Sequence, residues 1–132
     1  MQDMSRTPQE ERNLKLVLDM FDHVLIPFDA DAADRYIAAD YIQHNQLVDT
    51  GVEPLKAFLR KVRVESPDAT HDIKRSFADG DHVIVHYHVR RWPGDAGFAV
   101  MDIFRIEGDK IVEHWDVMQD VPADSPNPQS PF

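Results

Sequence analysis

Apolar residues in the first half of the chain recur at helical spacing. Thr7, Pro8 and Glu10 predict a helix start, because threonine can cap, proline suits the first helical position and glutamate completes a capping box. An apolar face then runs through residues 14–25, and Pro27 should end or break the helix. Two further helices are predicted, over residues 31–38 and 53–64.

After Pro67 the hydrophobic period changes from helical to alternating, which is typical of strands. Helices followed by antiparallel strands predict an α+β domain, with about three N-terminal helices packed on a curved, mainly antiparallel sheet that encloses a pocket. We expect this single domain to span residues 1–121, and the Pro-rich tail 122–132 to be mobile or draped over the surface. Residues 41–45 form an extended piece, and the predicted strands are 71–77, 82–91, 98–106 and 111–118.

Composition narrows the possible partners. The chain has 132 residues, 42% of them hydrophobic, which suits one domain with a buried core. It has no cysteine, so disulfides and thiolate chemistry are excluded. A net charge of -10 disfavours nucleic acid and anionic membrane surfaces. No apolar run could span a bilayer, and residues 1–11 are too polar for a signal peptide, so a cytoplasmic protein is predicted.

One carboxylate interrupts an apolar run in the second half. Strand alternation places Asp102 on the same face as Val100 and Phe104. An unpaired carboxylate is costly to bury, so Asp102 should be protonated, paired or turned toward a wet pocket. The alternative is an edge position with the side chain in water.

The last predicted strand carries a second polar pair. Alternation places His114, Asp116 and Met118 on one face. Two side chains with one residue between them point the same way, so one could transfer a proton while the other tunes its pKa. A solvated outer face with a surface charge pair is the alternative.

Three more histidines are candidates for chemistry. His44 leaves an apolar segment and could be a base at a pocket mouth, or a surface or capping residue. His86 and His88 share a strand face and, with Gly80, match the opening of the cupin metal motif. The glutamate of that motif is missing, so we predict no metal site, and the sequence leaves open which sheet face the two histidines occupy.

Segments 41–45, 51–59 and 101–116 together resemble the SnoaL-like polyketide cyclases of the nuclear-transport-factor-2-like (NTF2-like) superfamily. The resemblance extends from the first predicted helix to Val121, and it is most specific between Asp102 and Asp116. It implies a cone-shaped domain with a deep pocket between the long first helix and the concave sheet, usually in a homodimer.

The resemblance also implies roles for single residues. Asp102 matches a strand carboxylate that the related ketosteroid isomerases keep protonated to donate a hydrogen bond to an oxyanion. His44 falls where those isomerases have their carboxylate base. Their tyrosine on the first helix is replaced by Phe21 or Met20, which argues against steroid isomerisation.

In the cyclases an aspartate transfers protons beside a histidine, and Asp116 with His114 is the best match. The predicted catalytic residues are therefore His44, Asp102, His114 and Asp116. The apolar residues predicted to bind the substrate are Phe21, Val100, Phe104 and Met118.

These expectations predict an acid–base enzyme without cofactor or metal, acting on a hydrophobic carbonyl small molecule as an aldol-type cyclase or an isomerase or lyase. A base would remove a proton next to a carbonyl, and a hydrogen-bond donor would stabilise the enolate. The alternative is a non-catalytic ligand-binding or dimeric interaction module on the same fold. That alternative is favoured if Asp102 and His44 do not face one cavity.

Overall fold

A computed structural model describes residues 5–132, and part of the N-terminal segment examined for a signal peptide lies outside this range. Helices precede a run of strands, so the predicted α+β class is confirmed. The elements are α1 (Pro8–Met20), the π-helix η1 (Phe21–Leu25), the 3-10 helix η2 (Ala30–Arg35), β1 (Ile37–Gln43), α2 (Val52–Glu65), β2 (Thr70–Asp79), β3 (His82–Arg90), β4 (Phe98–Glu107) and β5 (Lys110–Asp120).

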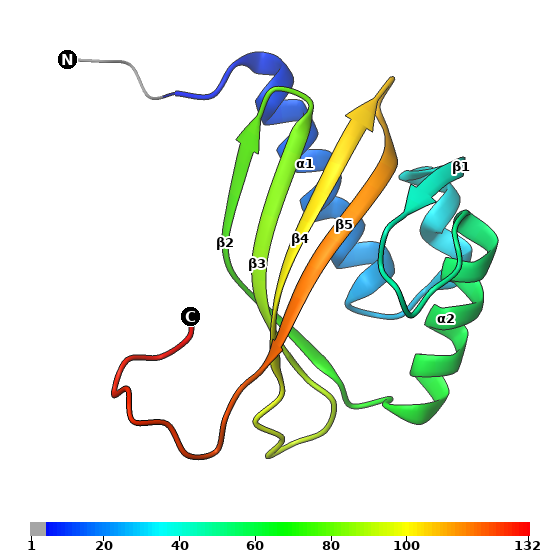
Figure 1. Cartoon of the computed structure of the whole chain (residues 1–132). Coiled ribbons are helices and arrows are strands. Elements are labelled where there is room, and N and C mark those ends of the chain that lie inside the picture. The colour runs from blue at the N-terminus through cyan, green and yellow to red at the C-terminus, as the bar shows by residue number, and fades with distance from the viewer. Residues whose placement is uncertain (1–4) are drawn as a thin grey trace.

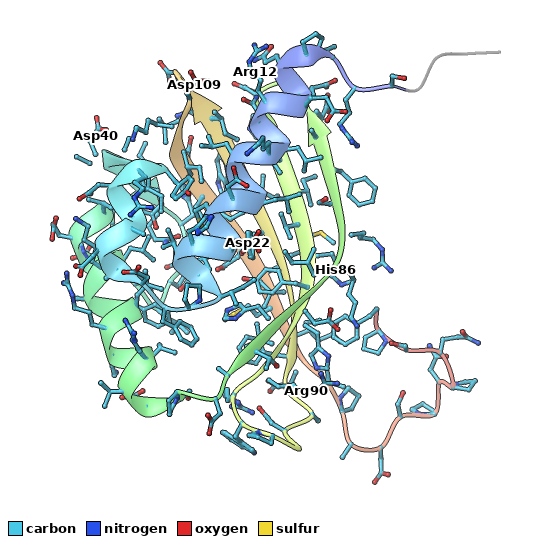
Figure 2. The ribbon with its side chains drawn as sticks, turned by 180° about the vertical axis from the view of Figure 1, so that it is seen from behind. Arg12, Asp22, Asp40, His86, Arg90 and Asp109 are labelled. Atoms are coloured by element: carbon cyan, nitrogen blue, oxygen red, sulfur yellow. The ribbon has the colours of Figure 1, made fainter. Side chains whose placement is uncertain are left out.

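The strands form one sheet in the order β1-β5-β4-β3-β2. β1 pairs with β5 in parallel, and the other neighbours are antiparallel. α1 crosses one face of this sheet, and α2 lies beside β1 at one edge (Figure 1). Seen from behind, α1 lies in front of the strands, so this face is the covered one (Figure 2).

The core lies between α1–η1 and the covered face of the sheet. Phe21 and Val17 are fully buried there, against Val83 and Val85 of β3. Each apolar side chain of this size contributes about 1.5–3 kcal/mol when it leaves water. Val83 and Val85 face this core, so His86 and His88, whose sheet face the sequence left open, lie on the outer face.

The predicted helix start is confirmed in detail. The Thr7 hydroxyl accepts a hydrogen bond from the Glu10 amide at 3.1 Å, and the Thr7 amide donates to the Glu10 carboxylate at 2.8 Å. At its other end α1 widens into a π-turn, in which the Ile26 amide donates to the Phe21 carbonyl at 2.8 Å.

The second predicted helix, 31–38, is shorter than expected. Only residues Ala30–Arg35 form a 3-10 helix, and the chain is already in β1 at Ile37. The physical reason is tertiary: Ile37 pairs with Ile111 of β5 and is buried in the core. Strand pairing therefore overrides the helical tendency of the alanines.

Residues 122–132 contain no helix or strand. The tail loops away from the sheet (Figure 2), and only its end returns to the outer face of β3, where the ring of Phe132 stacks on His88 with 4.3 Å between centroids. Within residues 5–132, no helix is both long enough and apolar enough to cross a membrane.

Candidate active site

A cavity of about 120 Å³ opens between the helices, β1 and the covered sheet face. A second one, of about 310 Å³, adjoins it and shares part of its wall. The walls are mostly apolar, with polar side chains gathered on one side. The shared residues are Phe28, Asn45, Phe58, His71, Tyr87 and Asp116.

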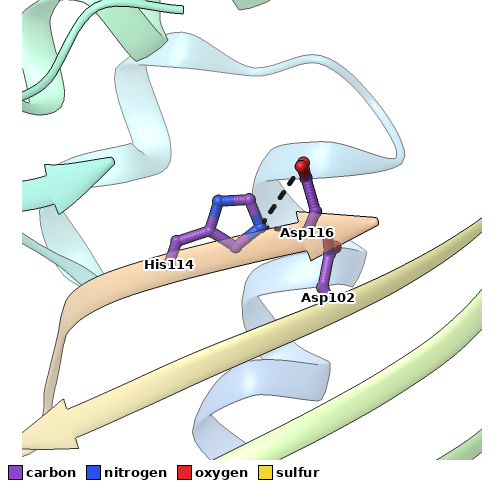
Figure 3. A group of neighbouring side chains, drawn as sticks. All are labelled: Asp102, His114 and Asp116. Atoms are coloured by element: carbon purple, nitrogen blue, oxygen red, sulfur yellow. Dashed lines mark hydrogen bonds and ion pairs between the residues drawn. The ribbon is translucent and has the colours of Figure 1, made fainter. Parts of the chain in front are cut away.

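Asp102, His114 and Asp116 meet at the wall of the inner cavity (Figure 3). Asp102 and Asp116 lie opposite each other on β4 and β5. His114 Nε2 lies 2.9 Å from Asp102 Oδ1 and 3.9 Å from Asp116 Oδ2. Asp102 is only 2% exposed, so its carboxyl group depends on its protein partners rather than on water.

The neighbours of His114 fix the position of its protons. The Asn45 amide donates to Gln43 Oε1 at 3.1 Å, which identifies that atom as an oxygen acceptor. The same oxygen lies 2.6 Å from His114 Nδ1, so Nδ1 must carry a proton. The contact between Nε2 and Asp102 then needs one more proton, on either the imidazole or the carboxyl group. His114 and Asp102 therefore form a proton-sharing pair.

Two opposing effects act on this imidazole. Burial lowers the pKa of His114, but the negative charges of Asp102 and Asp116 and the hydrogen bond to Asp102 outweigh it, so the pKa is raised. A charged imidazole also offsets the repulsion between two carboxylates on facing strand positions. The pair is thus suited to keep its proton near neutral pH.

Asp116 is held on one oxygen and open on the other. Asn45 Nδ2 donates to Asp116 Oδ2 at 2.7 Å. No residue within 5–132 donates to Oδ1, and Asp116 lines both cavities. A carboxylate with one free oxygen facing an apolar cavity can accept a proton from a ligand.

Two tyrosine hydroxyls complete the polar wall. Tyr87 donates to Asp102 Oδ2 at 2.8 Å, while the Tyr41 hydroxyl accepts from the Gln43 amide group. Burial, followed by the charges of Asp102 and Asp116, raises the pKa of both phenols. Both are neutral at physiological pH, and the Tyr41 O–H has no acceptor among residues 5–132, so it is available to a ligand oxygen.

The expectation that His44 faces the pocket is wrong. Its ring stacks on Trp115 at 4.9 Å, and its Nε2 lies 2.7 Å from the Glu113 carboxylate, both on the outer side of the sheet. Alternation explains the error, because His44 shares a face with Ile42, whereas Tyr41, Gln43 and Asn45 share the opposite face and line the cavity.

The residues predicted to bind the substrate lie at different depths. Phe104 lines the inner cavity, and Val100 and Met118 line the outer one. Phe21 lies behind the wall, where it makes edge contacts with the rings of Tyr87 and Phe104. The position expected for Phe21 is taken by its neighbour Met20, which lines the inner cavity.

His86 and His88 lie on the outer sheet face, away from the cavity. His88 Nε2 lies 2.7 Å from the Ala96 carbonyl. Burial, followed by the nearby charge of Arg75, lowers the pKa of His86. Within residues 5–132, the group with metal-ligand spacing is a different one: the ligand atoms of Asp102, His114 and Asp116 all lie within 4.8 Å of one another.

That group could hold either a proton or a divalent cation. The bond from His114 Nδ1 to Gln43 would orient Nε2, as outer partners do in metal sites. A cation, however, needs a bare Nε2 and would replace the proton between His114 and Asp102.

Several polar residues of the wall were not among the sequence-based candidates: Tyr41, Gln43, Asn45, His71 and Tyr87. For Tyr41, Gln43 and Asn45 the signal was present, since alternation along 41–45 places all three on one face. For His71 and Tyr87 the strand pattern gives the face, but it does not show that β2 and β3 border the cavity.

A two-layer α+β cone with a polar cluster inside an apolar cavity is the architecture of the NTF2-like superfamily. A family model of the SnoaL-like domain matches residues 17–114, a span that includes Asp102 and His114. The chain therefore belongs to the SnoaL-like family. A search of curated proteins gave no match.

Solved structures share the fold at low sequence identity. A proposed polyketide cyclase from Acidithiobacillus ferrooxidans is 21% identical, with a TM-score of 0.66 over 89% of this chain and 91% of its own. Another from Bacillus cereus is 18% identical, with a TM-score of 0.74 over 88% and 80%. A SnoaL-like protein of unknown function from Burkholderia thailandensis is 16% identical, with a TM-score of 0.70 over 83% and 96%.

Proposed function

We propose that this protein is an acid–base enzyme that acts on a hydrophobic carbonyl compound, as an aldol-type cyclase or an isomerase or lyase. The observation that carries the proposal is the convergence of Asp102, His114 and Asp116 on one apolar cavity. Apolar surroundings and paired charges are what an enzyme needs to set proton affinities near neutral pH.

Asp116 is the proposed base. Its free Oδ1 can take a proton from the carbon next to the ligand carbonyl, while Asn45 holds Oδ2 in place. The electron pair moves to the carbonyl oxygen, and the Tyr41 O–H can donate a hydrogen bond to that oxygen. The proton shared by His114 and Asp102 lies beside this base, with His114 Nε2 3.9 Å from Asp116 Oδ2, and it offsets the negative charge of Asp102 there.

The proton balance closes without any further reactant. In a cyclase the enolate carbon attacks a second carbonyl of the same molecule, forms a carbon–carbon bond, and leaves an alkoxide that takes a proton back from Asp116. In an isomerase Asp116 returns the proton to a different carbon. His44 has no role in either route, because it lies on the outer face.

Proton exchange at a ketone tests this proposal. Acetophenone in D₂O should lose its methyl proton signal faster with the wild-type protein than in buffer. Asp116→Asn should reduce the catalysed rate by about a hundred- to ten-thousandfold, because the base is lost. Asp120→Asn, on the same strand but outside both cavities, is the matched control and should keep the rate.

Two outcomes of the same assay separate the alternatives. Binding of the ketone without exchange above the buffer rate would support the alternative function, a non-catalytic ligand-binding module. The outward position of His44 favours that alternative, because this histidine cannot act in the cavity. Exchange that stops with a chelator and returns with a divalent cation would show that the cluster works with a metal rather than a proton.

A further inference from the structure

His71 is a cavity histidine that the proposed chemistry does not use. It lies on β2 opposite Val89 and lines both cavities. Its ring stacks on Tyr87 with 5.8 Å between centroids and meets Phe28 edge-on at 5.4 Å. Aromatic packing on two sides therefore fixes the plane of the imidazole.

The two ring nitrogens of His71 have different surroundings. Nδ1 is buried and has no hydrogen-bond partner. Nε2 makes no hydrogen bond within residues 5–132 either. Unlike Nδ1, however, it is not fully buried, so a small molecule can reach it. A buried N–H without a partner is rarer in proteins than a buried acceptor without one. The proton of a neutral His71 therefore belongs on Nε2, the accessible nitrogen.

His71 remains neutral at physiological pH. Burial lowers its pKa to about 4, although the charge of Asp102 acts in the opposite direction. A neutral imidazole with Nε2–H can donate a hydrogen bond to a ligand oxygen without bringing a charge into the cavity.

We propose that His71 is a specificity-determining residue that donates a hydrogen bond from Nε2 to a second oxygen of the ligand. The ligand would then carry two oxygen-bearing groups, one at the Asp102–His114–Asp116 cluster and one at His71. These two positions flank the side chain of Tyr87, whose hydroxyl bonds to Asp102 and whose ring stacks on His71. The inference rests on the proposed function, because it assumes that a carbonyl ligand occupies the cavity.

The tautomer can be measured without any ligand. In protein labelled with ¹⁵N-histidine, the two-bond ring correlations of His71 should show Nε2–H as the dominant form at pH 7. His71→Phe identifies the resonance and keeps the aromatic packing. A dominant Nδ1–H form, or a charged ring at pH 6.5, would overturn the inference.

Ligand discrimination tests the second contact with two probes of similar shape. 1,4-Diacetylbenzene has a second carbonyl oxygen, and 4-isopropylacetophenone has carbon in its place. The dissociation constant of the diketone, divided by that of 4-isopropylacetophenone, should be about threefold to tenfold higher in His71→Phe than in the wild type. The variant loses the hydrogen bond to the second oxygen, and a change of this size is the effect of one neutral hydrogen bond. His71→Gln, which restores a donor, should recover part of the preference, whereas a purely structural role would move both constants together.

The outcomes also separate this inference from the proposed function. An unchanged ratio in His71→Phe, with normal dependence of proton exchange on Asp116, would overturn the role of His71 and leave the acid–base proposal standing. Failure of both probes to bind the wild-type protein would remove the carbonyl ligand, and the inference would fall with it.

Discussion

The hydrogen bond between His114 and Asp102 holds one proton, and the charge of this pair can be measured directly. Burial lowers the pKa of His114, but Asp102 and Asp116 raise it further than burial lowers it. Asp102→Asn removes the nearest negative charge and leaves the burial, so the pKa of His114 should fall by about one unit or more. An NMR pH titration of the histidine ring signals measures this, with His82 on the outer face as the internal reference.

The same pair should affect stability in a defined pH range. The pKa of His114 is higher in the folded state than the ordinary value of 6.5, so its contribution is complete below pH 6.5 and is lost as the pH rises through the folded value. The difference in unfolding free energy between wild type and Asp102→Asn should therefore shrink as the pH rises. A difference that grows from pH 6 to pH 9 would contradict the charge assignment.

Single residues were predictable where strand alternation decided their position. Asp102, His114 and Asp116 were expected on faces that could serve one site, and the structure brings them together. His44 was misplaced because it shares a face with Ile42, and in this chain that face is turned away from the cavity. Alternation places Gln43 on the same face as Tyr41, but it could not show that Gln43 contacts His114, because the two residues lie 71 positions apart in the chain.

Among the connections between elements, the segment from β3 to β4 offers a sharp test. Gly97 has a φ of +71°, and a Cβ on it would lie 1.9 Å from the Val89 carbonyl oxygen. Gly97→Ala should therefore cost at least about 2 kcal/mol of unfolding free energy, because the backbone strain and the clash add up. Denaturant unfolding followed by circular dichroism measures this loss.

Gly94 is the matched control in the same connection. Its φ is +86°, but a Cβ there would meet nothing within 4 Å. Gly94→Ala should cost only about 1 kcal/mol, which is the strain of the left-handed backbone without a clash. Equal losses in the two variants would show that the contact between Gly97 and Val89 does not stabilise the start of β4.

The elements themselves were predictable in proportion to their local signals. Four strands with alternating residues and turn-forming connections lie close to their expected positions. The π-turn at Phe21–Leu25 was not expected, and the helix expected over 31–38 is the shorter 3-10 helix η2, because both depend on tertiary packing rather than on local pattern. The π-turn matters for the site, since Met20 just before it and Leu25 at its end line the inner cavity.

At the scale of the whole molecule, the outer face of the sheet carries apolar side chains that no helix within residues 5–132 covers (Figure 1). Cross-strand pairing places an apolar row over four strands: Phe77, Ile84, Ile103 and Trp115. Val117 and Met101 extend it on the neighbouring row, and Val117 is 71% exposed. A continuous apolar surface is unusual on the outside of a monomer, so we expect a second copy of this chain to pack against it.

This homodimer can be tested by placing one charge on the outer face. Copies with a net charge of -10 repel each other, so the apolar contact must provide the attraction. Val117→Lys should shift the wild-type dimer toward monomer in sedimentation velocity, because a two-fold interface buries the new charge twice. Val64→Lys, at an equally open position on α2 that is 82% exposed, should leave the dimer intact. A monomeric wild-type protein would contradict this prediction and show that the outer face is free in solution.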